Sequence, residues 1–317
     1  MKSVGRRIRG TVRAFGLVGV SSVALAATPT NPGGASVRAT AVATATARSG
    51  GLIGDSLLGR SGKLRFRFLL PARPLDIPTL ERLFGDSVTR SPGVYAVRDS
   101  AMSKPFSFIS LVPFSTKAGG LLGGYRVGFW PAEKKRARTG AYGNPDGFIT
   151  VTADNQDTYV SDHFRLRDFL THDQQDVWPK YLVLREELID KLELVIDELE
   201  RGGVAVSHLA VMSGFRTPEY NAKGVGRKGG RAKDSRHQFG DAADVFVDND
   251  GDGRMDDINH DGRVDTRDVR VIIGAVERVE ARHPDLVGGA GLYRATRAHG
   301  PFAHVDVRGT RARWGRG

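Results

Sequence analysis

Two short stretches of the chain carry histidines and aspartates at spacings that suit a metal site. In SRHQFGDAAD, His237 and Asp244 stand seven residues apart around Gly240, and small residues there let the backbone turn and approach closely. In FAHVDVR, His304 and Asp306 are two residues apart, so on a β-strand both side chains point to one face. Two neutral imidazoles and one carboxylate, with a fourth position left to water, are the ligands of a catalytic zinc. The pattern therefore predicts a zinc-dependent hydrolase.

A third stretch, VMSGFRTPEYN, makes this interpretation more specific. The order SGFRTPEYN, SxHxxGxAxD and FxHxDxR resembles the zinc D-Ala-D-Ala carboxypeptidase and murein endopeptidase family, over about half of the chain from Ser161 onward. The resemblance implies that His237, Asp244 and His304 are the zinc ligands. It also implies that Arg216 helps to bind the substrate and the tetrahedral oxyanion, because a fixed guanidinium opposes the negative charge of the transition state.

The general base is the point at which this chain departs from the better known branch of that family. There an acidic residue three positions before the last ligand histidine is the base, whereas this chain has Pro301. Asp306, on the same strand face as His304, is the first alternative, and His299 is the second. Asp306 could equally be a carboxylate that orients a ligand imidazole. If neither residue accepts a proton, the protein would bind zinc without catalysis.

An acidic stretch that follows the first motif predicts calcium binding. Residues 248–268 read DNDGDGRMDDINHDGRVDTRD, and calcium loops of the EF-hand or dockerin type place oxygen ligands at positions 1, 3, 5, 9 and 12, with Gly at position 6. One register fits completely, whereas an upstream register ends on Asn259, which has no carboxylate. The clustered carboxylates would repel one another without a cation, so we expect at least one structural Ca²⁺ rather than a solvated acidic loop. The expected ligands are Asp257, Asn259, Asp261, Asp265 and Asp268 in the complete register, and Asp248, Asp250, Asp252 and Asp256 in the upstream one.

The elements that position these motifs predict an α+β fold. Apolar residues at spacings of three and four over residues 184–199 predict an amphipathic helix, residues 204–213 a strand that leads to the arginine motif, and residues 265–282 a second helix. The resemblance implies a C-terminal zinc peptidase domain, residues 159–317, with an antiparallel sheet flanked by helices and the calcium loop, 248–268, inserted in it. Acidic residues of the first helix are expected on its exposed face, and they are Glu186, Glu187, Asp190, Glu193, Asp197 and Glu198.

The N-terminal half predicts export followed by a small domain. Residues 1–27 have basic residues before a run of small and apolar ones that ends in ALA, which is typical of a secretory signal peptide. Residues 28–62, rich in Ala, Thr, Gly and Ser, predict a flexible linker. Short apolar and aromatic runs broken by Gly and Pro predict a small β-rich domain over residues 63–158. We therefore expect a periplasmic or secreted protein with no stable membrane span after signal cleavage.

Charge and composition indicate the kind of partner. Lys and Arg exceed Asp and Glu by 47 to 36, a formal charge of +11, and there is no cysteine. This balance suits an anionic polymer such as nucleic acid, a membrane surface or cell-wall polysaccharide, and no nucleic-acid motif accompanies it. Peptidoglycan is the partner that the family resemblance implies. The oligomeric state stays open. The expected function is zinc-dependent hydrolysis of stem-peptide or cross-link amide bonds, with a non-catalytic cell-wall-binding protein or a calcium-dependent adhesion module as the alternatives.

Overall fold

A computed structural model describes most of the chain and confirms the α+β fold class. The predicted signal peptide, residues 1–27, lies outside the described residues. No helix in the described part is long and apolar enough to cross a membrane. The described residues are 41–47, 53–69, 77–100, 102–137, 139–226 and 230–315.

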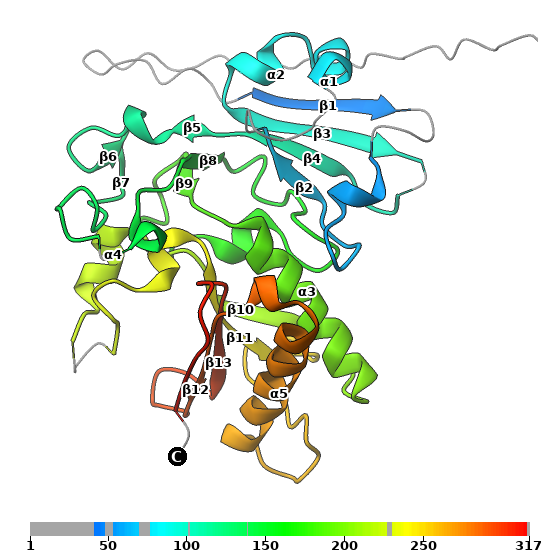
Figure 1. Ribbon diagram of the computed structural model, residues 1–317, viewed down its shortest axis with the longest axis vertical. Helices are drawn as coiled ribbons and strands as arrows, with labels where there is room; N and C mark the ends of the chain where they lie inside the picture. Colours follow the sequence, from blue (N-terminus) through cyan, green and yellow to red (C-terminus); the bar gives the residue numbers. More distant parts are fainter. Residues whose placement is uncertain are drawn as a thin grey trace, which may run out of the picture.

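The N-terminal part is built on a four-stranded sheet of order β1-β3-β4-β2 (Figure 1). These strands are β1 Ala41–Ala47, β2 Phe66–Phe68, β3 Gly93–Asp99 and β4 Phe106–Ser110. Two helices, α1 Ile77–Phe84 and α2 Ser87–Arg90, lie beside it, and a small apolar cluster that includes Leu80, Tyr95 and Phe106 fills the space between helices and sheet.

The predicted linker, residues 28–62, is wrong where the structure describes it. Residues 41–47 form strand β1, which pairs in parallel with β3. Further along, the backbone amides of Arg60 and Ser61 donate to the Asp190 carboxylate at 2.8 and 2.9 Å. The small residues of β1 have no apolar periodicity and therefore do not indicate a strand. The hydrogen bonds that hold β1 come from β3, about 50 residues away in sequence, and a local pattern does not reveal such a partner.

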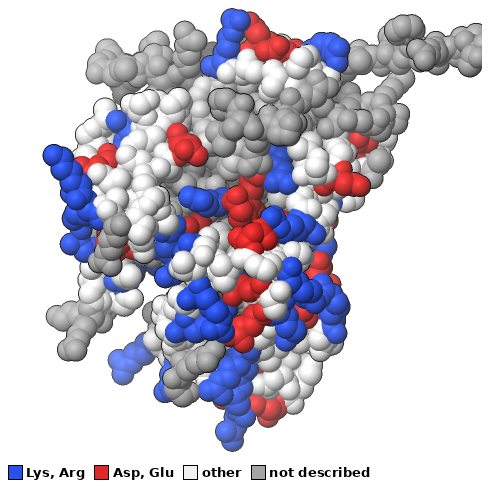
Figure 2. Space-filling view, viewed as in Figure 1, with Lys and Arg blue, Asp and Glu red and all other residues white. Residues whose placement is uncertain are grey.

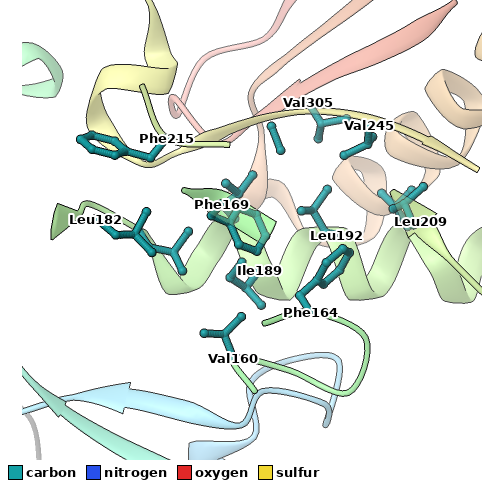
Figure 3. Packing of buried hydrophobic residues seen from close by; sticks show 14 of the residues in the cluster. Val160, Phe164, Phe169, Leu182, Ile189, Leu192, Leu209, Phe215, Val245 and Val305 are labelled. Carbon is teal, nitrogen blue, oxygen red and sulfur yellow. The ribbon is translucent and has the colours of Figure 1, made fainter. Parts of the chain in front are cut away.

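The boundary expected at residues 158/159 is crossed by a sheet and by the core. β5 Val112–Pro113 and β8 Gly147–Val151 share a three-stranded sheet with β9 Lys180–Leu182. A two-stranded hairpin, β6 Leu121–Leu122 and β7 Tyr125–Arg126, follows β5. Trp130 is fully buried, and its Nε1 donates to the Gln238 carbonyl at 2.8 Å. One hydrophobic core contains residues from both sides of this boundary, such as Trp130 and Phe148 on one side and Leu182 on the other. Figure 3 shows the C-terminal side of this core, with Val160, Leu192 and Val245 packed in it.

The C-terminal part contains a five-stranded sheet of order β10-β11-β13-β12-β14. It is antiparallel, as expected, except for the parallel pair β12–β14 at one edge. Val245, Val305 and Leu292 pack into the core with the long helices, so these helices cover one face. The strands are β10 Leu209–Ser213, β11 Ala242–Val247, β12 Gly289–Tyr293, β13 Phe302–Asp306 and β14 Ala312–Trp314, and the helices are α3 Glu186–Arg201, α4 Pro218–Lys223 and α5 Thr266–Arg282.

The acidic face of α3 is buried, which corrects the prediction of an exposed face for most of its residues. α3 lies between the N-terminal part and the C-terminal sheet, so both of its sides are covered (Figure 1). Glu186 bonds to the Arg67 guanidinium at 2.5 Å, and Glu193 to His163 Nδ1 at 2.7 Å. Each buried carboxylate thus has a polar partner, as burial of charge requires. The buried residues are Glu186, Asp190, Glu193 and Glu198, whereas Glu187 is exposed and Asp197 half-buried.

The surface charge is mixed rather than gathered on one side of the view in Figure 2. Lys and Arg side chains alternate with Asp and Glu over this face. The net charge of +11 therefore does not form a single basic stripe there.

Candidate metal centre

The predicted zinc ligands converge on the face of the C-terminal sheet opposite the helices. Asp244 on β11 pairs directly with His304 on β13, so their side chains lie together. A 3₁₀ helix, Arg236–Phe239, delivers His237, and Gly240 follows it with φ 66°. A Cβ at Gly240 would lie 2.3 Å from the Val183 carbonyl oxygen, so both the turn and the close approach require glycine.

Three ligand atoms meet at one point. His304 Nδ1 lies 2.9 Å from Asp244 Oδ1 and 3.2 Å from His237 Nε2, and His237 Nε2 lies 3.2 Å from the same oxygen. Ligand atoms about 2.0–2.2 Å from a tetrahedral zinc are about 3.3 Å apart. The three side chains are buried and close enough together to hold one ion. Their spacing and chemistry therefore fit zinc.

The outer nitrogen of each imidazole has a partner that fixes the tautomer. His237 Nδ1 lies 2.7 Å from the Gly214 carbonyl oxygen, which can only accept, so this nitrogen carries the proton. His304 Nε2 lies 3.0 Å from Asp306 Oδ2, a carboxylate that likewise accepts. With a metal ion in place of the proton between His304 Nδ1 and Asp244, the inner nitrogens would present lone pairs to the same point as the Asp244 oxygen. Outer partners of this kind orient metal-bound histidines.

The pKa shifts of the three ligand residues show that the cluster favours positive charge. Burial lowers the pKa of His304, but its hydrogen bonds to Asp244 and Asp306 outweigh burial and raise this pKa to about 9. Burial raises the pKa of Asp244, yet the two imidazoles hold it well below its usual range. The pKa of His237 is lowered, chiefly by burial. A buried carboxylate that stays ionised beside two imidazoles is a good cation ligand.

Arg216 contacts a ligand. Its Nη2 donates to Asp244 Oδ2 at 2.5 Å, and its Nε donates to Ser213 Oγ at 2.8 Å. The backbone amide of Arg216 donates to the His237 carbonyl at 3.1 Å, so the arginine motif and the first histidine motif are tied together. The resemblance assigned Arg216 to the substrate. The structure places it on the outer oxygen of Asp244, and among the described residues its Nη1 has no hydrogen-bond partner.

Asp306 occupies the position of an orienting carboxylate and not that of a general base. It is fully buried, and it lies on the far side of the His304 ring from the ligand atoms. Its oxygens also accept from the Gly289 amide at 2.7 Å and from the Arg308 guanidinium. These contacts, with Arg308 foremost after His304, hold the pKa of Asp306 far below its usual range although burial opposes them. An oxygen with these partners cannot readily accept a proton from water.

His299, the second candidate base, lies near the sheet but not in the ligand cluster. Its ring packs edge-on against Phe302 at 5.0 Å, and its Nδ1 lies 2.8 Å from the Gly300 carbonyl oxygen. Its described contacts do not include any of the three ligands. The contacts of the described residues therefore support neither Asp306 nor His299 as the general base.

Several contributors to the site were not predicted. The Gly214 carbonyl is a backbone group, so no residue type could mark it. Arg308 continues the two-residue alternation of His304 and Asp306, and that periodicity could have identified it. Trp314, on β14, lies with its ring centroid 5.1 Å from that of His304.

The acidic stretch forms two loops with the same backbone design. The position-6 glycines, Gly253 and Gly262, have φ of 78° and 81°. Their amides donate to the first aspartate of each loop, Asp248 at 3.1 Å and Asp257 at 2.8 Å. The two registers predicted from sequence thus both have the turn of a calcium loop.

Among the described residues, the upstream loop brings three of its carboxylates together, although the sequence pattern is complete only in the downstream one. Carboxylate oxygens of Asp248, Asp250 and Asp256 lie within 4.8 Å of one another. In the downstream loop, Arg267 contacts Asp261 at 2.6 Å and Asp265 at 2.8 Å. Its hydrogen bonds lower the pKa of Asp265 to about 2. Arg267 therefore pairs with two of the calcium ligands expected in the downstream loop.

Comparisons with known proteins add no relative. None of the protein-family models, curated proteins or solved structures compared with the chain matches it.

Proposed function

We propose that this protein is a zinc-dependent peptidase that hydrolyses amide bonds in the stem peptides or cross-links of peptidoglycan. The observation that carries the proposal is the convergence of three buried acceptor atoms, from His237, Asp244 and His304, whose outer partners fix the tautomers. Zinc, when bound by them, would supply a Lewis acid and lower the pKa of a bound water.

The protein groups around the ligands have separate tasks. Gly214 and Asp306 hold the two imidazoles in the orientation that presents their inner nitrogens. Arg216 holds the outer oxygen of Asp244 through Nη2. Its Nη1 has no described partner and would oppose negative charge on the substrate carbonyl oxygen, which is the kind of prearranged donor that lowers a hydrolytic barrier.

Peptidoglycan as the substrate class rests on the sequence. The three motifs resemble peptidases of that polymer, and the basic balance suits an anionic cell-wall partner. Export to the periplasm or the exterior is part of the same proposal.

A non-catalytic cell-wall-binding protein is the second candidate, and one observation favours it. Pro301 stands where the better known branch has its acid, and Asp306 is enclosed by Arg308, Gly289 and His304. Such a protein would keep the metal centre and the partner without turnover.

Mass spectrometry of purified peptidoglycan incubated with the zinc-loaded protein separates the two candidates. We expect new fragments with wild type, none with His237→Ala, and wild-type fragments with His208→Ala, in which an exposed histidine outside the centre is changed. The masses and stereochemistry of the new ends would identify the bond. An unchanged digest from folded, zinc-loaded wild type that still sediments with peptidoglycan would reject the peptidase and favour the binding protein.

A further inference from the structure

Tyr293 lies on the same face of the sheet as the ligands. In the register of β12 and β13, Gly291 pairs with His304 and Tyr293 pairs with Phe302. Directly opposite residues of an antiparallel pair share a face, and Phe302 shares that face with His304 because they are two apart. The Tyr293 ring stacks on Phe302, with centroids 4.6 Å apart and planes 6° from parallel. The ring therefore rises from the sheet beside the metal centre.

The hydroxyl of Tyr293 is held toward His304 by Trp314. Trp314 Nε1 donates to the Tyr293 hydroxyl oxygen at 3.0 Å. A Cβ at Gly291 would lie 2.2 Å from that same nitrogen, so the indole lies over Gly291, the residue directly opposite His304. The indole and imidazole centroids are 5.1 Å apart. These contacts place the Tyr293 hydroxyl close to Gly291 on β12, the residue directly opposite His304.

The polarity of this hydrogen bond leaves the hydroxyl proton free. An indole N–H can only donate, so the Tyr293 oxygen is the acceptor and its own O–H can donate elsewhere. Among the described residues no protein acceptor takes that proton. Burial raises the pKa of Tyr293, and the negative charge of Asp244 acts in the same direction. The group is therefore a protonated donor at neutral pH, in a site where the sequence supplies no acid at Pro301.

We propose that Tyr293 is a further catalytic residue, whose hydroxyl donates a hydrogen bond to the scissile carbonyl oxygen as that oxygen gains negative charge. The inference rests on the proposed function and adds a second donor to the one that Arg216 supplies. Arg216 approaches from the β10 side of the ligands, whereas Tyr293 approaches from β12, on the other side of β13. Removal of one prearranged donor of this type lowers kcat by about 10²- to 10³-fold.

The test compares wild type with Tyr293→Phe, which keeps the ring on Phe302 and removes only the hydroxyl. Tyr159→Phe is the matched control, because its hydroxyl bonds to Arg165 and not to the ligand cluster. Three quantities are measured for each protein: the Kd for zinc, the Kd of the zinc-loaded protein for the phosphinate analogue of D-Ala-D-Ala by calorimetry, and kcat on peptidoglycan. The phosphinate oxygen carries the charge that the carbonyl oxygen acquires.

We expect Tyr293→Phe to bind zinc like wild type and to bind the phosphinate about 10- to 100-fold more weakly. We expect its kcat to be about 10²- to 10³-fold lower. Unchanged phosphinate affinity and kcat would overturn the inference while leaving the proposed function intact. A parallel loss of zinc affinity would also overturn it, because the hydroxyl would then support the metal centre and not the oxyanion. Wild type that binds zinc but neither binds the phosphinate nor cleaves peptidoglycan would reject the proposed function, and the inference with it.

Discussion

The Nε2 atom of His304 lies 3.0 Å from Oδ2 of Asp306, and this contact decides which nitrogen of the imidazole faces the other ligands. The same carboxylate accepts from Arg308 and from the Gly289 amide, so it is held on three sides. Its place behind the ring makes Asp306 a positioning residue for the metal centre. That role predicts an effect on metal affinity rather than on turnover alone.

Asp306→Asn should weaken zinc binding by about 10- to 100-fold, because a neutral amide polarises the imidazole less and loses the Arg308 ion pair. The measurement is a competition titration against a chelating dye. Asp157→Asn, at an exposed aspartate paired with Arg167, is the control and should bind zinc like wild type. A folded Asp306→Asn protein with unchanged zinc affinity would contradict the positioning role.

Arg216→Lys should lower kcat/KM on peptidoglycan by about 10²-fold or more, because an ammonium cannot hold both Ser213 and Asp244 and still present a donor to the substrate. The control is Arg126→Lys, at an arginine half exposed on the hairpin and paired with Glu219. Equal turnover of Arg216→Lys and wild type would show that the guanidinium geometry does not matter.

Calcium should raise the Tm, and the upstream loop should account for most of the effect. We expect stabilisation by about 2.7 kcal/mol when free calcium is roughly 100-fold above its Kd. Asp248→Asn should remove most of this gain, because Asp248 belongs to the convergent carboxylates. Asp257→Asn should remove less, because Arg267 already neutralises the downstream loop. The reverse order in calorimetric scans with calcium or with a chelator would restore the ranking made from sequence.

His163→Ala should move acid unfolding to higher pH. Burial raises the pKa of Glu193, but its hydrogen bonds to His163 outweigh burial and leave this pKa below its usual value. A carboxylate with a depressed folded pKa stabilises the protein above its unfolded pKa, and that stability is lost as pH falls through the folded pKa. Without the imidazole, the folded pKa rises, so the loss begins at higher pH. Circular dichroism against pH measures this shift, and an unchanged acid transition in folded His163→Ala would contradict the role of the imidazole.

The convergence of the ligands was predictable because it depends on local rules. Strand alternation puts His304 and Asp306 on one face, and a glycine turn returns Asp244 to it. The roles of the outer partners were not predictable to the same extent, since Asp306 was left open between base and orienting group. Only the placement of the ligand atoms on the opposite side of the imidazole distinguishes them.

Features that depend on partners distant in the chain could not be predicted from the sequence. The acidic residues of α3 have the periodicity of an exposed face, but Arg67 and the Phe68 amide bond to Glu186 and the His163 amide bonds to Glu193. Glu198 pairs with Arg278 and Arg282, on α5. Strand β1 likewise depends on β3. The downstream calcium register matched the ligand pattern fully, yet the pattern does not include Arg267, whose charge competes for the same oxygens.

The sheet that joins β5 and β8 to β9 has a consequence for how the chain can be divided. A fragment that starts at residue 159 would leave β9 without its neighbour, would uncover the acidic side of α3, and would lose the Trp130 bond to the segment that carries His237. Such a fragment contains every ligand of the metal centre and still lacks part of the shared core. The two halves are therefore expected to unfold in one cooperative transition, and the smallest fragment that folds around the metal centre is expected to extend well upstream of the motifs.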